Sequence, residues 1–408
     1  MRCFILAIPF LCLGIFRVGA AAEPWPLGTF TLGSPVTTNV PPGFTAYSFT
    51  VSNCPRVTQP MNGTFGIAGP TQGSSPRGLV IFFTGGPGSE WWSEQQAGPP
   101  ELLRAFLEDL RAQGFTIVQV KWSGTWHHSS PGNDAGTAHL GCRPATVIKY
   151  IHDRYYLPMG IPRRRGQAGF CITGNSGGAS QVGYALSHYG LESILDVVIP
   201  TGGPPHSVLE KCMLAASTDP YFYNEGTRAR IDKGFGFFNN DGPGFRQDAS
   251  FTPRWQEESV ATGGSDYDHP MTRVHFIQGA QDRGMQTVGG DYYNRLRSEG
   301  TWFASWEIAP DTQHETYASA SGRAALRAAI LGTVVSAPSM ADGRFEFSVS
   351  GPANYNYTVE SSANLSDWTA VQTQQGPFTF RDATAGSAPA RFYRVMTRPE
   401  PPAGAVVR

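Results

Sequence analysis

The stretch GFCITGNSGGAS, residues Gly169–Ser180, decides the fold of this 408-residue chain. Its first part, Phe170–Thr173, is apolar or β-branched and predicts a short buried strand. A Gly-Asn-Ser-Gly-Gly turn, Gly174–Gly178, comes next. The residues after this turn predict a helix, which contains Ala179, Gln181, Val182, Ala185 and Leu186.

Ser176 lies in the middle of the turn. A serine on a tight strand-to-helix turn is held in a strained backbone conformation that lifts its hydroxyl clear of the sheet. The crossing strand and helix leave room only for very small residues two positions away on either side, which here are Gly174 and Gly178. A glycine-rich turn without chemistry is the alternative, because one G-x-S-x-G motif is weak evidence of function.

The segments around this turn alternate between strands and helices. Strands are predicted at 78–84, 116–122, 196–200, 274–277 and 302–308, and helices at 101–112, 145–156, 292–297 and 316–332. Residues 23–76 predict antiparallel strands ahead of this core. The alternation predicts an α/β fold over residues 23–335, with a doubly wound, mostly parallel sheet covered by helices on both faces.

Two parts of the chain depart from this alternation. Between about 204 and 269 it lapses into aromatic-rich segments such as PYFYNEG and KGFGFFNNDGPGF. Irregular segments of this length are usually functional, so we interpret the insertion as a cap over the site; a surface insertion is the alternative. Residues 338–398 alternate apolar and polar, which predicts a small all-β, sandwich-like module before a loose tail at 399–408.

The N-terminus has the pattern of an export signal. Arg2 is followed by an apolar run, Cys3–Phe16, and then by small residues at Gly19–Ala22. We therefore expect residues 1–22 to be a signal peptide and the protein to be secreted, to the outside of the cell or to a periplasm. The apolar run is too short to span a bilayer comfortably, so we expect no membrane span. A formal net charge of −1 argues against a nucleic-acid partner.

Four cysteines follow the expected signal: Cys54, Cys142, Cys171 and Cys212. An even number in an exported chain suits two disulfides, for which three pairings exist. Cys142 and Cys212 both follow predicted strand ends on the same side of the sheet, which favours that pair. Four reduced, buried cysteines are the alternative.

Four features of the first 335 residues resemble the α/β-hydrolase superfamily and occur in its chain order. They are the GNSGG turn with Ser176, the TGGPG loop at 84–88, Asp282 in VHFIQGAQD and His314 in APDTQHE. The resemblance implies a serine esterase-like enzyme. The C-terminal segments YTVESSANLSDWT, PFTFRDA and RFYRV resemble short modules on exported bacterial proteins.

The resemblance assigns a role to each of these residues. It implies Ser176 as the nucleophile, His314 as the base that takes its proton, and Asp282 as the group that orients the base. The amides of Gly177 and Gly86 are implied as donors to the negative oxygen that develops during attack, with Gly85 as the alternative to Gly86. No cofactor is implied, and the sequence holds no H-E-x-x-H metal motif and no phosphate loop.

Other residues compete for two of these roles. The alternative bases are His127, His128, His269 and His275. The alternative acids are Asp291 and Asp311. We expect His275 to be structural, because it lies inside a strand, and Asp291 to cap a helix that begins at Tyr292.

Tryptophans follow two of the predicted strands. Trp91 and Trp92 come after the TGGPG loop, and Trp126 comes after the next strand. Ligands of open α/β sheets bind at these strand ends, so we expect the three residues to line an aromatic substrate pocket. Ordinary loop packing is the alternative.

Together these features predict a secreted serine hydrolase that cleaves small or polymeric carboxylic esters, such as plant-wall esters. The C-terminal module would hold it near a polymer or a cell surface. A peptidase is one alternative, because TGGPG is closest to the HGGPG loop of prolyl aminopeptidases, although threonine replaces the histidine. Such a peptidase needs carboxylates in the cap, where Glu257 and Glu258 form the adjacent acidic pair. A non-catalytic binding protein on a hydrolase scaffold is the other alternative.

Overall fold

The computed structural model describes residues 23–161, 169–301 and 303–332, and beyond them 334–335, 339–341, 344–350, 355–364, 367–376, 378–384 and 391–399. The expected signal at 1–22, Trp302 and the tail after residue 399 lie outside the described residues. Within the described ranges, no helix is both long enough and apolar enough to span a membrane.

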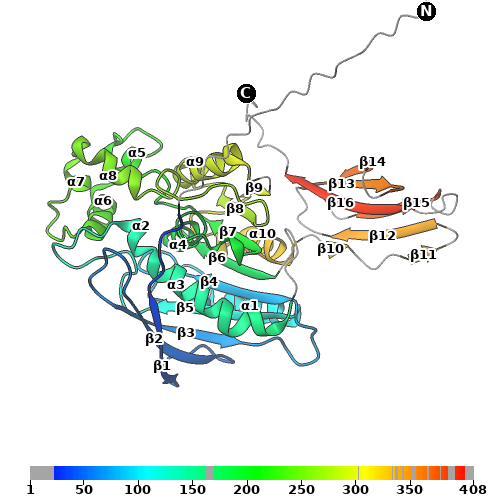
Figure 1. Ribbon diagram of the computed structural model, residues 1–408, viewed down its shortest axis with the longest axis horizontal. Coiled ribbons are helices and arrows are strands. Elements are labelled where there is room, and N and C mark those ends of the chain that lie inside the picture. The colour runs from blue at the N-terminus through cyan, green and yellow to red at the C-terminus, as the bar shows by residue number, and fades with distance from the viewer. Residues whose placement is uncertain are drawn as a thin grey trace, which may run out of the picture.

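A nine-stranded mixed sheet forms the centre of the larger part of the protein (Figure 1). Its strand order is β1-β2-β3-β5-β4-β6-β7-β8-β9. Pairing is antiparallel from β1 to β3 and between β3 and β5, and parallel from β5 through β4 to β9. The strands are β1 (Thr29–Val36), β2 (Thr45–Ser52), β3 (Met61–Ala68), β4 (Gly78–Phe83), β5 (Phe115–Trp122), β6 (Phe170–Asn175), β7 (Val197–Thr201), β8 (Arg273–Gly279) and β9 (Ala304–Ala309).

Helices cover both faces of the parallel strands. Apolar residues of α1 and α10 share one core, and those of α3, α4 and α9 share the other. These helices are α1 (Pro100–Ala112), α3 (Cys142–Ile151), α4 (Gly177–Ser187), α9 (Arg283–Glu299) and α10 (Ala320–Leu331), with a short α2 (Thr137–Leu140) before α3.

The central strand β4 shows why the sheet is apolar on both sides. Successive side chains of a strand point to opposite faces. Val80 and Phe82 therefore join the core beneath α1 and α10, whereas Ile81 and Phe83 join the core beneath α3 and α4. All four side chains are completely buried. The arrangement confirms the predicted doubly wound sheet, and the chain has the α/β-hydrolase fold.

The turn between β6 and α4 is as tight as its glycines predict. A Cβ atom on Gly174 would lie 2.5 Å from the backbone of Gly178, and one on Gly178 would lie 2.8 Å from the carbonyl oxygen of Phe83. Neither position has room for a side chain. Strand β6, helix α4 and strand β4 are therefore in direct backbone contact at this point.

Helix α9 is longer than predicted. It begins at Arg283, so Asp291 lies inside the helix and does not cap it. The capping side chain is that of Asp282, whose Oδ1 accepts a hydrogen bond from the amide of Met285 at 3.4 Å. Gly289 interrupts the apolar pattern inside α9 because the helix packs closely against the backbone of Gly203 there. A Cβ there would lie 2.5 Å from the carbonyl oxygen of Gly203.

The insertion at 204–269 consists of short helices joined by irregular segments. Its helices are α5 (Leu209–Leu214), α6 (Glu225–Asp232), α7 (Pro243–Arg246) and α8 (Thr252–Glu257). Trp255 and Phe235 are buried within it, which gives the aromatic-rich sequence a packing role. The insertion therefore has its own helices and buried aromatic residues.

The C-terminal residues form two small antiparallel sheets (Figure 1). One sheet has the order β10-β12-β11 with β15 paired to β12, and the other has the order β14-β13-β16. Alternate residues such as Phe347, Val349, Tyr357, Val359 and Phe380 form a separate core. This is the predicted all-β module. Its strands are β10 (Val334–Val335), β11 (Ser339–Ala341), β12 (Arg344–Ser350), β13 (Tyr355–Ser362), β14 (Thr369–Gln375), β15 (Phe378–Asp382) and β16 (Phe392–Pro399).

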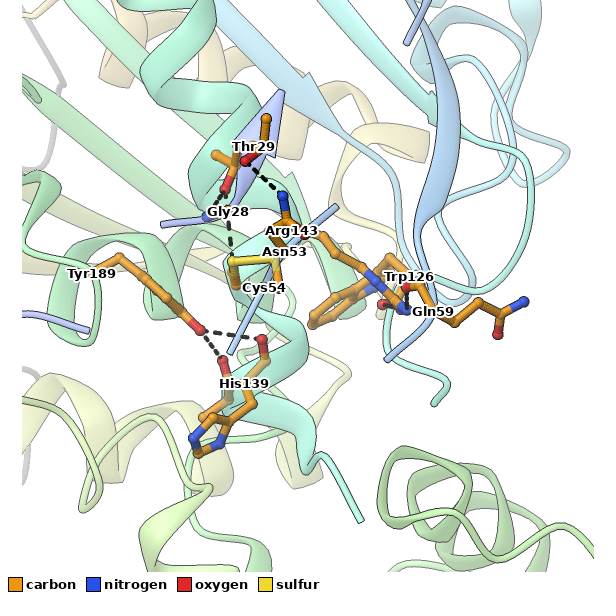
Figure 2. Close-up of a disulfide and its surroundings, with 12 residues drawn as sticks. Gly28, Thr29, Asn53, Cys54, Gln59, Trp126, His139, Arg143 and Tyr189 are labelled. Atoms are coloured by element: carbon orange, nitrogen blue, oxygen red, sulfur yellow. Dashed lines mark hydrogen bonds between the residues drawn. A yellow bond between two sulfur atoms is a disulfide. The ribbon is translucent and has the colours of Figure 1, made fainter. Parts of the chain in front are cut away.

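The favoured disulfide Cys142–Cys212 is wrong. Cys142 bonds to Cys54, with the two Cα atoms 5.8 Å apart (Figure 2), and Cys171 and Cys212 are buried free thiols. Cys54 follows β2, which packs against α3, and Cys142 is the first residue of α3. Cys212 does not follow a strand end, since it lies in α5 of the insertion. The covalent link therefore joins the antiparallel edge of the sheet to a covering helix.

The substitution Gly174→Ala should destabilise the protein by about 1–3 kcal/mol, because its methyl group collides with the backbone of Gly178. Gly290→Ala is the matched control. Gly290 lies in α9 with no atom within 4 Å of an added Cβ, so this change should be neutral or stabilising by up to about 1 kcal/mol. Urea unfolding measures both, and equal effects would contradict the packing argument.

Peptide mapping of the non-reduced protein should recover one linked pair, Cys54 with Cys142. Cys171 and Cys212 should react with iodoacetamide only after unfolding, because burial raises the pKa of Cys171 to about 12 and also raises that of Cys212. Replacing Cys54 with alanine should cost about 2–5 kcal/mol of stability. A recovered Cys142–Cys212 peptide would overturn the pairing.

Candidate active site

Ser176 has a backbone conformation that L-amino acids rarely adopt. Its φ is +54° and its ψ is −118°. The conformation is held from both sides, since the Ser176 amide donates to the carbonyl oxygen of Thr201 at 2.9 Å and the next residue begins α4. Such strain costs about 1–3 kcal/mol and persists only where the surroundings fix it. The serine is therefore held at the strand-to-helix turn, as predicted.

Asp282 and His314 are brought together from two loops at the same end of the sheet. Asp282 follows β8 and His314 follows β9. The Nδ1 atom of His314 lies 2.7 Å from Oδ2 of Asp282, while the other carboxylate oxygen caps α9. Both carboxylate oxygens thus have partners, which fixes the carboxylate. The hydrogen bond also leaves Nε2 as the free nitrogen of the imidazole.

The charge of Asp282 controls the protonation of His314. Burial of the imidazole opposes its protonation, but the hydrogen bond and charge of Asp282, together with Glu315, outweigh this effect and raise the pKa of His314 above 6.5. The proton is therefore held more firmly than on an isolated histidine. An imidazole in this state accepts and returns protons near neutral pH.

One cavity contains Ser176 and His314. Its volume is about 330 Å³, and its lining residues are Gly86, His127, Ser176, Gly177, Pro205, His206, Phe222, Tyr223, Asn224, Thr227, Arg230, Ile231, Met285 and His314. The volume is typical of a small-molecule site. Several lining residues, from Pro205 to Ile231, belong to the insertion, which therefore walls the cavity.

The two predicted oxyanion residues lie against each other in this cavity. A Cβ on Gly177 would lie 2.8 Å from the carbonyl oxygen of Gly86 and 3.0 Å from its amide nitrogen. Gly86 has a φ of +52°, which glycine adopts without cost. Gly85, the alternative, also lies beside the nucleophile, because a Cβ on Gly85 would lie 3.3 Å from Cβ of Ser176. Gly85 does not line the cavity, however. This geometry favours Gly86.

The competing histidines have other surroundings. His275 lies inside β8 and bonds to Ser305 and Glu307, and His269 lies 3.3 Å from the hydroxyl of Ser187. Burial, followed by neighbouring charges, lowers the pKa of His128 to about 4 and lowers that of His127 well below 6.5. Among the described residues that line the cavity, only His314 is a histidine bonded to a carboxylate.

Asn175 is a site residue that the sequence analysis missed. Its Oδ1 accepts hydrogen bonds from the hydroxyl of Thr201 at 2.9 Å and from the amide and hydroxyl of Thr316 at 3.3 and 3.1 Å. The residue before the serine is therefore tied to the segment just after His314. The GNSGG motif placed Asn175 next to the serine, but the hydrogen bonds to Thr316 can be seen only in the structure.

A buried arginine holds the loop that carries His127. Arg143 donates to the carbonyl oxygens of Trp126 at 2.6 Å and His128 at 2.8 Å, and to that of Gln59 at 3.3 Å (Figure 2). Burial lowers the pKa of Arg143 to about 10, so it stays charged at neutral pH. Arg143 follows Cys142 directly, so the disulfide lies one residue from this contact.

The three predicted substrate-binding tryptophans do not line this cavity. The indole of Trp91 is buried and donates to the carbonyl oxygen of Asn39 at 2.7 Å. Trp92 packs between Phe82 and Phe106 in the core beneath α1, and Trp126 is buried against His206 and Tyr184. Large apolar rings next to a core gain more by burial than by lining an open cavity. Their role is ordinary loop packing.

Within the described ranges, no group of three or more His, Cys, Asp or Glu side chains is arranged to hold a metal ion. The lining of the cavity includes the nucleophile candidate Ser176, the base candidate His314 and the two glycines Gly86 and Gly177.

Asp282→Asn should lower the pKa of His314, because it removes the negative charge that favours the imidazolium. The base must be neutral to accept a proton, so activity should rise with pH through this pKa. In the variant the inflection should move to lower pH, with a rate about 10,000-fold below that of the parent protein. A pH series of kcat/KM and NMR titration of the imidazole measure both, and an unmoved inflection would contradict the pairing.

No protein-family model matches the sequence, and no curated protein sequence matches it. Some solved structures are similar to the chain, at low sequence identity. Est1E from Butyrivibrio proteoclasticus is 14% identical, with 66% of this chain and 92% of that chain covered at a TM-score of 0.40. Acetyl xylan esterase 1 from a Thermoanaerobacterium species is 12% identical, with 71% and 83% covered at 0.43. An acylaminoacyl peptidase from Pyrococcus horikoshii is 14% identical, with 69% and 39% covered at 0.41.

Proposed function

We propose that this protein is a secreted serine hydrolase that cleaves carboxylic esters through an acyl-enzyme intermediate. The observation that carries the proposal is the shared cavity. The cavity holds a serine in a strained strand-to-helix turn and a histidine whose Nδ1 is hydrogen-bonded to Asp282. A hydroxyl, a base and an orienting carboxylate are the parts that nucleophilic acyl transfer needs.

In the first half of the reaction, Nε2 of His314 accepts the proton of the Ser176 hydroxyl as the oxygen attacks the ester carbonyl. The carbonyl oxygen becomes negative and is bound by the amides of Gly177 and Gly86, two residues that lie against each other. The bond to the alcohol then breaks, and His314 returns the proton to the leaving alkoxide. Ser176 is left as an acyl ester.

In the second half, water replaces the alcohol. His314 takes a proton from the water, the resulting hydroxide attacks the acyl carbonyl, and the proton passes back to Ser176 as the acid leaves. Asp282 stabilises the imidazolium in both halves, in agreement with the raised pKa of His314. Because Nδ1 is bonded to Asp282, proton transfer proceeds through one fixed nitrogen.

The surroundings of the cavity favour ester over aminopeptidase chemistry. A free amino terminus needs carboxylates, and none occurs among the described residues that line this cavity. Glu257 forms ion pairs with Arg56 and Arg254. Glu258 is buried against His139 and the amide of Ala138. Neither member of the acidic pair lines the cavity, so this pair does not supply the carboxylates that the peptidase alternative needs.

Secretion and a polymeric substrate belong to the same proposal. The export signal expected at residues 1–22 and the Cys54–Cys142 disulfide fit an oxidising compartment. The catalytic domain was predicted at 23–335 and the module at 338–398; because β10 pairs with β12, we assign residues 23–332 to the catalytic domain and 334–399 to a module that holds it near a polymer or a cell surface. A polymeric or plant-wall ester suits this organisation.

Ser176→Ala should abolish hydrolysis of nitrophenyl esters and labelling by a fluorophosphonate probe, because both need the activated hydroxyl. Ser298→Ala, at an exposed position of α9, is the control that should change neither. The parent protein should cleave the esters faster than aminoacyl-nitroanilides. Faster cleavage of the anilides would favour the peptidase, and an absence of labelling would favour a non-catalytic binding protein.

A further inference from the structure

A second hollow adjoins the Ser176 cavity. This side hollow has a volume of about 610 Å³ and is lined by Pro87, Thr125, His128, Glu225, Gly226, Ala229, Arg230, Lys233, Asn240 and Phe245. Arg230 lines both spaces. Gly86 and Pro87 are consecutive residues with one in each lining, and so are His127 and His128. The two spaces therefore share walls from the oxyanion loop, the loop after β5 and helix α6.

The side hollow carries positive charge. Arg230 lies in the last turn of α6 and Lys233 follows three residues later, so they lie on neighbouring positions of the helix surface. In the part of the chain that the structure describes, neither side chain forms an ion pair with a carboxylate. The net charge of the whole chain is −1, so this positive region is local.

Carboxylates near these cations do not neutralise both of them. Glu225 also lines the side hollow, at the opposite end of α6 from Lys233. Asp232, next to Lys233 in sequence, is buried and accepts hydrogen bonds from the amides of Gly244 at 2.9 Å and Phe245 at 2.7 Å. Two cations thus face one carboxylate in the lining.

Two buried imidazoles on the cavity wall add unused hydrogen-bonding capacity. His127 and His206 are each 3% exposed, and the Nδ1 atom of each lacks a hydrogen-bond partner among the described residues. Burial lowers the pKa of His206 to about 3 and, with the neighbouring positive charges, lowers that of His127, so both are neutral. A buried polar atom without a partner costs free energy that a bound polar group removes.

We propose that the substrate is an ester with a second, ionised carboxylate, which Arg230 and Lys233 bind while Ser176 attacks the ester carbonyl. This inference rests on the proposed esterase function and names its substrate class. The planar guanidinium of Arg230 can bind a carboxylate through two parallel hydrogen bonds. Lys233 lines the side hollow and Arg230 lines both spaces, so the charged part of the substrate extends into the side hollow.

The test compares two nitrophenyl esters of equal length, 4-nitrophenyl hemiadipate and 4-nitrophenyl hexanoate. The ratio of their kcat/KM values should favour the anionic ester and fall as ionic strength rises. Arg230→Gln should lower this ratio about tenfold, the size expected for one partly exposed charge-assisted hydrogen bond. Arg104→Gln, an exposed arginine of α1 paired with Glu94, is the control that should leave the ratio unchanged. An equal ratio in the parent and Arg230→Gln proteins would overturn the inference.

A binding measurement separates this inference from the proposed function. Calorimetry with adipate should show binding to the Ser176→Ala protein and about tenfold weaker binding when Arg230→Gln is added. If the parent protein cleaves the hexanoate ester but shows neither the preference nor adipate binding, the inference is wrong and the esterase function stands. If it cleaves neither ester, the esterase function is wrong, and adipate binding still decides whether the anion site exists.

Discussion

The close contact between β6 and α4 is the constraint on which the rest of the site depends. Gly174 and Gly178 let the two elements touch, and the turn between them must then hold Ser176 at a φ of +54°. This conformation costs about 1–3 kcal/mol. The hydrogen bonds of the Ser176 amide and the Asn175 side chain, each contributing about 1 kcal/mol, offset that cost. The turn keeps its strained conformation because these bonds tie it to Thr201 and Thr316.

Asn175 extends this constraint to the base. Its side-chain oxygen bonds to Thr201 at the end of β7 and to Thr316, two residues after His314. The histidine is in turn bonded to Asp282, which caps α9. Hydrogen bonds therefore connect the ends of β6 and β7 to the segment after β9, and the His314 of that segment to the loop after β8. These bonds fix the loop that carries the base relative to the end of β6, next to the nucleophile.

The sequence predicted the features that repeat along the chain. Apolar runs such as 78–83 located the parallel strands, because burial on both faces leaves no polar position. The motif around Ser176 located the turn, since its glycines are required by backbone contacts within a few residues. Contacts between distant segments were harder to predict. The insertion contributes Arg230 and His206 to the lining of the cavity. The tryptophans are buried, and Cys54 forms a disulfide with Cys142, 88 residues further along the chain. No local pattern encodes these partners, because they depend on how the whole chain packs.

Two cysteines of the described residues lie outside the disulfide, and their burial has a consequence for it. Thiol–disulfide exchange begins when a thiolate attacks a sulfur–sulfur bond. Cys171 lies in β6 and Cys212 in α5, both buried, and burial keeps their thiols protonated at neutral pH. Neither can act as the attacking group while the protein is folded. The native cross-link is therefore protected from scrambling by the same burial that makes the spare sulfurs unreactive.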